Sequence, residues 1–259
     1  MRRLIIEEPV TRFAQWALPV AWFALAVTAI AVALIRFQFV EFFPGLVALA
    51  AGLFLAIEAA GLSFIAFVRI WREGRRGLGR AVKALLLAMA ILAYPGWFGL
   101  KALTLPPLTD VSTDIVDPPT FSRSRAALEA RGGRIPPDVA PELRRLQRAA
   151  YPQIAPLTLD IPPDQVYELV RRAAQNRKWE VIESARPGGR VGLGRLDAVD
   201  RTFLLRIADD VTVRIRPRAD GARIDVRSAS RIGQHDLGQN AHRIQRFLEE
   251  VSNLAIAIR

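Results

Sequence analysis

Three apolar stretches occupy the first hundred residues of this 259-residue chain. They run from Trp16 to Ile35, from Phe42 to Val68 and from Ala81 to Leu100. Each is long enough to cross a hydrocarbon layer of about 30 Å as an α-helix. Because lipid offers no partner for backbone polar groups, helices are the natural form for such stretches. The sequence predicts an integral membrane protein with a three-helix transmembrane region over residues 1–103.

The basic residues beside the spans predict how the chain is oriented. With three spans, the N-terminus and the second loop share one side of the membrane. That side carries nine basic residues and the other side two: Arg2, Arg3, Arg12, Arg69, Arg72, Arg75, Arg76, Arg80 and Lys83 against Arg36 and Lys101. Lys and Arg in short loops stay on the cytoplasmic side. We therefore expect a multi-pass protein of the inner (cytoplasmic) membrane, with a cytoplasmic N-terminus and a periplasmic C-terminal domain.

The net charge of +11 does not indicate a nucleic-acid partner. Roughly half of the excess lies in the membrane half, where it sets topology and attracts the headgroups of membrane lipids. The chain has no cysteine, which excludes disulfides, thiol catalysis and thiolate metal sites.

Small residues recur every four positions in the second span, at Ala48, Gly52, Ala56 and Ala60. This spacing places them on one helix face, where another backbone can approach closely. We expect this strip to pack against another helix, and it is a candidate contact for a membrane-protein partner.

Glu58 is the one acidic residue deep in this span, about 16 Å from the Arg69 end. A carboxyl group is costly at that depth, so we expect it to face protein and not lipid. Thr28 and Tyr94 fall at comparable depth and are its candidate hydrogen-bond partners. A structural or assembly role is favoured over ion transport, because no second charge lies at the same depth.

Residues 104–156 form a proline-rich segment that cannot be a continuous helix or a central strand. We expect an extended linker with one short helix, from Asp138 to Ala149, where apolar residues follow helical spacing. Phe121 and Tyr151 are bulky anchors, which predict that the linker docks on the domain that follows.

Residues 157–259 are predicted to form an α+β domain that contains both strands and helices. A short strand and a helix opened by Pro162 and Pro163 come first. Strands are then predicted at 178–183, 190–199, 202–207, 211–217 and 222–230, with turns at 187–189, 209–210 and 220–221. A helix from about Leu237 to Ala257 ends the chain, capped by Asp236. The expected fold is an antiparallel sheet packed by helices, including a long C-terminal helix.

From about Leu108 to the end, the chain resembles the family catalogued as domain of unknown function 1499. The resemblance rests on these runs: Asp110–Asp114, Asp117–Phe121, Tyr151-Pro152, Asp209–Pro217, Asp225–Gly233 and Asp236–Asn240. It implies no activity and no catalytic residues, because the family has no established function.

Ser228, Ser230, His235 and Asp236 offer the residue types of an acyl-transfer site within nine positions. A histidine and an aspartate that are adjacent in sequence seldom orient each other, and no Gly-x-Ser-x-Gly turn is present. A membrane-anchored hydrolase that uses Ser230 and His235 is therefore kept only as an alternative.

Cofactor and metal sites are not indicated either. His235 and His242 are the only histidines and have no carboxylate cluster beside them, so we expect no metal. The glycines at 188, 189, 192 and 194 lie between two predicted strands, where a hairpin explains them better than a phosphate loop.

Four arginines are predicted to project from one face of a hairpin: Arg214, Arg216, Arg223 and Arg227. We expect them to face solvent, where their guanidinium groups suit bidentate recognition of phosphate or carboxylate. The alternative is a plain solvated surface. The sequence thus favours a non-enzymatic domain that binds an envelope lipid, an anionic ligand or a membrane-protein partner, with an assembly subunit of a larger membrane complex as the other reading.

Overall fold

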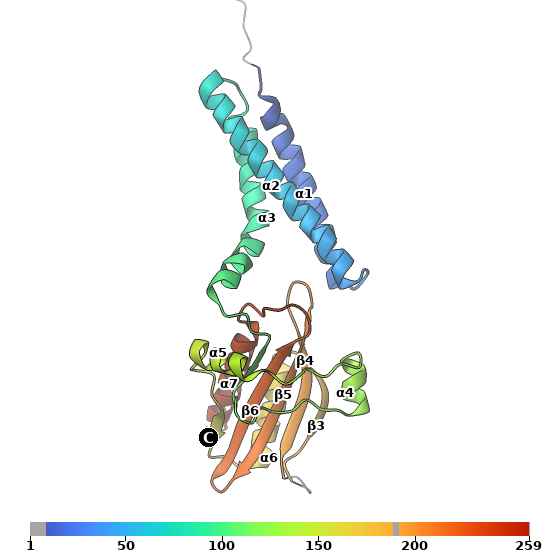
Figure 1. The fold of residues 1–259 in the computed structure, drawn as a ribbon, viewed down its shortest axis with the longest axis vertical. Helices are drawn as coiled ribbons and strands as arrows, with labels where there is room; N and C mark the ends of the chain where they lie inside the picture. The colour runs from blue at the N-terminus through green and yellow to red at the C-terminus, as the bar shows by residue number, and fades with distance from the viewer. Residues whose placement is uncertain (1–8, 189–191, 259) are drawn as a thin grey trace, which may run out of the picture. The chain divides into compact units, whose positions relative to one another are not determined.

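The computed structural model describes residues 9–188 and 192–258 and divides into two compact units (Figure 1). One unit is built from the three N-terminal helices. The other begins at Lys101 and contains the sheet. Arg2, Arg3, Gly189 and the start of the strand predicted at residue 190 lie outside the described residues.

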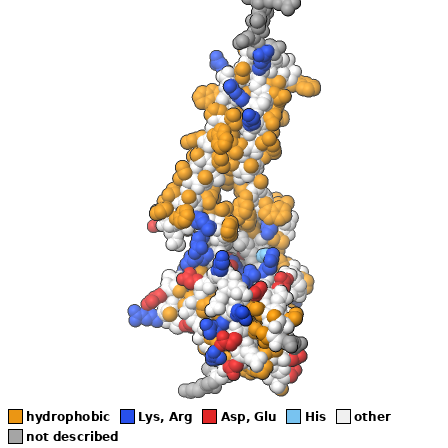
Figure 2. Space-filling view, turned by 180° about the vertical axis from the view of Figure 1, so that it is seen from behind, with side chains coloured by type: hydrophobic (Ala, Val, Ile, Leu, Met, Phe, Trp, Pro, Cys, Tyr) orange, Lys and Arg blue, Asp and Glu red, His pale blue; other side chains and the backbone are white. Residues whose placement is uncertain are grey.

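The helical unit consists of α1 (Arg12–Arg36), α2 (Phe42–Glu73) and α3 (Leu78–Thr104). All three are long and apolar enough to cross a membrane, which confirms the prediction of three apolar helices. Figure 2 shows hydrophobic side chains covering this unit. The helices meet through alanines: Ala17, Ala59 and Ala84 are fully buried in one shared cluster. Small contact residues let the three backbones approach closely.

The predicted small-residue strip of α2 packs against α1 of the same chain. Gly52 and Ala56 are buried, and a Cβ at Gly52 would overlap the Thr28 hydroxyl of α1. Ala48 and Ala60 are half-buried. A contact with another membrane protein through this strip stays a prediction.

The second unit contains a six-stranded antiparallel sheet. Its strands are β1 (Asp110–Ser112), β2 (Leu157–Leu159), β3 (Glu180–Ala185), β4 (Gly194–Arg201), β5 (Ala208–Arg218) and β6 (Gly221–Ser230). The order is β1-β6-β5-β4-β3, and β2 also pairs with β6. This arrangement confirms the predicted antiparallel sheet packed by helices.

One face of the sheet is the hydrophobic core. In β5 every second residue points into this core, with Val211, Val213 and Ile215 fully buried. Helices α6 (Pro163–Asn176) and α7 (Gln239–Ala257) cover this face. The rings of Trp179 and Phe247 stack with their centroids 4.6 Å apart.

The opposite face of the sheet is polar, and the segment 113–150 crosses it (Figure 1). We call this segment the strap. It contains α4 (Arg125–Ala130) and α5 (Pro141–Ala150). Phe121, predicted as an anchor, is 4 % exposed, and Tyr151, just beyond the strap, is 8 % exposed. The strap and the residue that follows it therefore belong to the folded domain.

Three local predictions are wrong. Residues 202–207 are not a strand but a loop, which is closed by hydrogen bonds between Thr202 and Ile207. Asp209 and Asp210, predicted as a turn, lie within β5. The linker also holds a second helix, α4, because the Ser124 hydroxyl caps it by accepting from the Ala127 N–H.

Candidate functional site

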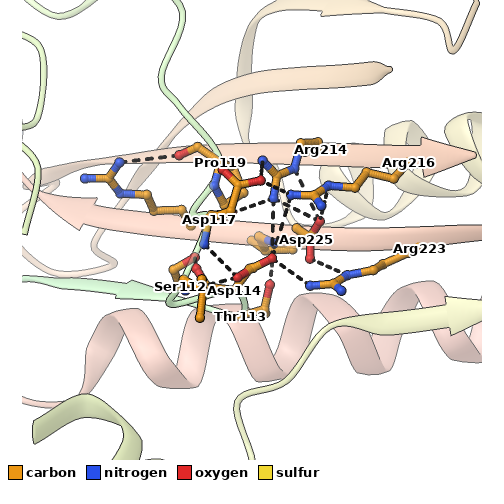
Figure 3. Close-up of polar contacts among 12 residues, drawn as sticks. Ser112, Thr113, Asp114, Asp117, Pro119, Arg214, Arg216, Arg223 and Asp225 are labelled. Atoms are coloured by element: carbon orange, nitrogen blue, oxygen red, sulfur yellow. Dashed lines mark hydrogen bonds and ion pairs between the residues drawn. The ribbon is translucent and has the colours of Figure 1, made fainter. Parts of the chain in front are cut away.

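The polar face of the sheet carries a group of three arginines and three aspartates (Figure 3). We call it the ion-pair group; its members are Arg214, Arg216, Arg223, Asp114, Asp117 and Asp225. The fully buried Asp225 accepts from all three arginines, at 2.9 to 3.2 Å. Since positive and negative charges are equal in number, this group holds no spare cation.

Asp114 ties the strap to this group. Its carboxylate accepts from the Arg223 guanidinium at 2.8 Å and from the backbone N–H groups of Val116 and Asp117. Burial alone would raise the pKa of Asp114, but these hydrogen bonds and the nearby arginines hold it below its ordinary value.

Arg227 is not solvent-facing, and the prediction that it would be is wrong. It is 1 % exposed and its Nη2 lies 2.9 Å from Asp110 Oδ2. The same guanidinium donates to the Pro137 carbonyl and lies 4.9 Å from the centroid of the Phe121 ring. Arg214 is also mostly covered, with its side chain 14 % exposed. Strap atoms and neighbouring carboxylates thus occupy positions where a ligand anion was expected, and anion binding by these four arginines stays a prediction.

A second set of buried ion pairs joins Arg131 of the strap to strands β4 and β5. Arg131 bonds to Asp197 at 2.8 Å and to Asp210 at 3.2 Å. Asp210 also accepts from Arg231, and Asp197 from Arg195. Arg131 and Asp197 were not predicted from the sequence. Asp197 alternates with the core residues Leu196 and Ala198, so the pattern places it on the polar face but gives no signal that the strap buries it.

Beside Asp110 and Asp210 the strap leaves a cavity of about 330 Å³. One wall is the strap from Arg134 to Ala140 with Leu143, and the other is formed by the ends of β1, β5 and β6. Most of the lining is apolar. Its lining residues are Leu108, Thr109, Asp110, Arg134, Ile135, Pro136, Pro137, Asp138, Val139, Ala140, Leu143, Asp210, Ala229, Ser230 and Arg231.

The charges around the cavity do not cancel. Asp110, in the wall, is shared by Arg144 and Arg227, and Arg227 also lies 3.9 Å from Asp138, so two arginines face two carboxylates. On the other side three arginines share two carboxylates, because Arg131, Arg195 and Arg231 bond to Asp197 and Asp210. This second set leaves one positive charge in excess, and the wall residue Arg134 adds another.

Arg144 provides a spare donor near the cavity. Its side chain is 9 % exposed, and its Nη1 donates to Asp110, which lines the cavity. Its Nη2 is buried and has no hydrogen-bond partner among the described residues. Burial lowers the pKa of Arg144, and only the nearby aspartates oppose this effect. An anion in this region would relieve the shortage of acceptors.

The residues considered for acyl transfer are engaged elsewhere. Ser230 Oγ accepts from Asn240 Nδ2, and Ser228 Oγ bonds to Asn240 Oδ1. His235 Nε2 lies 3.1 Å from the Leu105 carbonyl oxygen, while its Nδ1 accepts from the Leu237 N–H. In the part of the chain that the structure describes, neither serine bonds to His235. The Asp236 carboxylate accepts from the backbone N–H groups of Gly238 and Asn240 at the start of α7, although the N-cap residue itself is Gly238 and not Asp236 as predicted.

A family model described as "Protein of unknown function (DUF1499)" matches residues 110–251, more than half of the chain. The chain belongs to the DUF1499 family. Comparison with curated proteins and with solved structures gives no match.

The DUF1499 match begins at β1 and ends inside α7. Part of the runs that carry the resemblance meets on the polar face: Asp110, Asp114 and Asp117 supply carboxylates, and β5 and β6 supply the arginines that bind them. These parts of the DUF1499 motif therefore attach the strap to the sheet.

Outside the DUF1499 domain, Glu58 does not form its predicted hydrogen bonds. Thr28 Oγ1 is buried against Gly52 without a hydrogen-bond partner, and Tyr94 is 53 % exposed beside Phe98. The prediction is wrong because α2 turns Gly52 and Ala56 toward α1. Glu58 then points to the opposite side of α2, where it is exposed.

Proposed function

We propose that this DUF1499 protein is a membrane-anchored binding protein whose C-terminal domain holds a small amphiphilic anion, such as a medium-chain fatty acid, in the strap cavity. The observation that carries the proposal is the combination of an apolar wall with unbalanced guanidinium charge around one cavity. The volume of about 330 Å³ lies at the lower end of the range for small-molecule sites.

The apolar lining supports a ligand with a hydrocarbon part. Ile135, Val139 and Leu143 come from the strap, and Leu108 and Ala229 come from the sheet side. Such a wall gains little from a fully polar solute, because transfer of apolar surface out of water supplies the driving force.

The charges support an anionic headgroup. Arg134 lines the cavity and is exposed, and Arg231 lines it while sharing Asp210 with Arg131. Guanidinium groups bind carboxylate and phosphate in a bidentate manner, and partial burial strengthens such bonds.

The three apolar helices support the membrane location, where amphiphiles are concentrated. The basic asymmetry of the loops supports a periplasmic position for the domain in the inner membrane of a bacterial envelope. The proposed role is non-enzymatic and requires no cofactor.

The test uses the full chain in nanodiscs and two matched variants of α5. Leu143 and Leu146 are each 37 % exposed, but only Leu143 lines the cavity. Radiolabelled decanoate should bind the wild type and Leu146→Trp alike, while Leu143→Trp, which fills the cavity, should bind at least tenfold more weakly. Decanol, which lacks the charge, should compete poorly.

A second pair of variants tests the headgroup contact. Arg134→Gln should weaken decanoate binding several-fold, whereas Arg145→Gln, an exposed residue of α5 outside the cavity lining, should not. Equal binding by Leu143→Trp and the wild type would contradict the proposal.

A further inference from the structure

Glu58 lies on an exposed face of α2 that neither α1 nor α3 covers in the described helical unit. At about 100° per residue, Ala51, Phe54, Gly61 and Ile65 fall within about 60° of Glu58 around the helix axis, and all are exposed. The buried side of α2, with Gly52, Ala56 and Ser63, lies on the far side of the axis. The helical unit therefore leaves a carboxyl group facing outward, deep in the span.

We propose that two copies of this chain pair through this face of α2, with the two Glu58 carboxyl groups hydrogen-bonded to each other. The proposal goes beyond ligand binding in the DUF1499 domain and does not depend on it. Lipid hydrocarbon offers a carboxyl group no hydrogen-bond partner, so a polar contact must come from protein.

A second copy is the partner that fits this chemistry. Copies inserted in the same orientation place Glu58 at the same depth, and a two-fold axis along the membrane normal brings identical residues together. A neutral carboxyl group is both donor and acceptor, so it is complementary to itself. No Lys, Arg or His lies within ten residues of Glu58 on α2.

The surface beside Glu58 allows two helices to approach. A Cβ added at Gly61 would meet nothing within 4 Å, so this position is open on the outer side of α2. Gly61 and Ala51 flank Glu58 along the same face and present little side-chain bulk. Small residues at such positions let two backbones come close enough for short side chains to hydrogen-bond.

The absence of cysteine makes a direct test possible, because any introduced thiol is the only one in the chain. Ile65→Cys and Phe64→Cys are a matched pair: the two residues are adjacent in depth and both exposed, but Phe64 lies about 120° from Glu58 around the axis. Oxidation of intact membranes should give a disulfide-linked dimer of Ile65→Cys. Phe64→Cys should stay monomeric. The pair Phe54→Cys and Ile57→Cys should repeat this pattern.

The role of the carboxyl group is tested in the same background. Adding Glu58→Leu to Ile65→Cys should lower the crosslinked fraction at least fivefold, whereas Glu58→Gln should retain most of it, because a primary amide also pairs with itself. Crosslinking that is equal for Ile65→Cys and Phe64→Cys would overturn the dimer face. Unchanged crosslinking with Glu58→Leu would overturn the carboxyl pair. Because the cysteine pairs retain Glu58, their result does not depend on whether the Glu58 variants fold.

Discussion

Arg227 illustrates what a single buried charge does in this domain. Its guanidinium is enclosed by Asp110, the Pro137 carbonyl and the Phe121 ring, all from outside its own strand. Two-residue alternation in the sequence placed Arg227 on the polar face correctly, alongside Arg214 and Arg223. The alternation could not show that another segment covers that face, because a covered polar face and a solvated one have the same pattern.

At the residue scale, removing Arg227 should be costly. Arg227→Ala leaves Asp110 with only Arg144 as an ion partner and empties a buried position, so the free energy of unfolding should fall by about 3–5 kcal/mol. Arg218→Ala, at the exposed end of β5, is the control and should change it by less than about 0.5 kcal/mol. Urea unfolding of the full chain in detergent measures both. Similar values for the two variants would mean that the Arg227 ion pair contributes little.

At the element scale, strands in which apolar and polar residues alternate could be predicted from the sequence. The strap could be predicted only in part. The ranges 211–217 and 222–230 closely match β5 and β6, because apolar residues at every second position encode a sheet with one buried face. Helix α5 was also close to its prediction. The short strand β1 was missed because its pairing with β6 joins residues more than a hundred positions apart.

The strap should loosen in acid. The pKa of Asp114 is held below its ordinary value, as is that of Glu183, which accepts from the Ser124 hydroxyl of the strap. A carboxylate with a lowered folded-state pKa stabilises the fold above its unfolded-state pKa, about 4, and loses that effect as the pH falls through the folded-state value. The melting temperature of the wild type should therefore exceed that of Asp114→Asn at pH 6, and the difference should shrink below pH 4.

The control for the acid experiment is Asp220→Asn, at the exposed β5–β6 turn. This variant should melt close to the wild type at every pH. If the difference between the wild type and Asp114→Asn stays constant from pH 6 to pH 3, Asp114 does not couple the strap to protonation.

At the scale of the whole molecule, the sequence was sufficient for three apolar helices and an α+β domain, but it could not reveal the cavity. The cavity joins residues 134–143 to residues 229–231, which come together only when the strap lies on the polar face of the sheet. The outward direction of Glu58 was equally hidden, because it depends on which side of α2 packs on α1.

Orientation in the membrane is the prediction that belongs to this scale. Because basic flanks favour the cytoplasm, alkaline phosphatase fused after Arg76 should be inactive and the same reporter fused after Arg259 should be active. The reverse pattern would place the DUF1499 domain in the cytoplasm. A cytoplasmic reporter, such as green fluorescent protein, should give the complementary result at each junction.

Photolabelling tests the proposed ligand site most directly. A decanoic acid analogue with a diazirine in its chain is added to the full-length protein in membranes, and the sample is irradiated. Peptide mass spectrometry then identifies the residues that carry the label. We expect label on the strap between Ile135 and Leu143, competition by unlabelled decanoate, and loss of the label in Leu143→Trp but not in Leu146→Trp. Label confined to the apolar helices, or unchanged in Leu143→Trp, would contradict it.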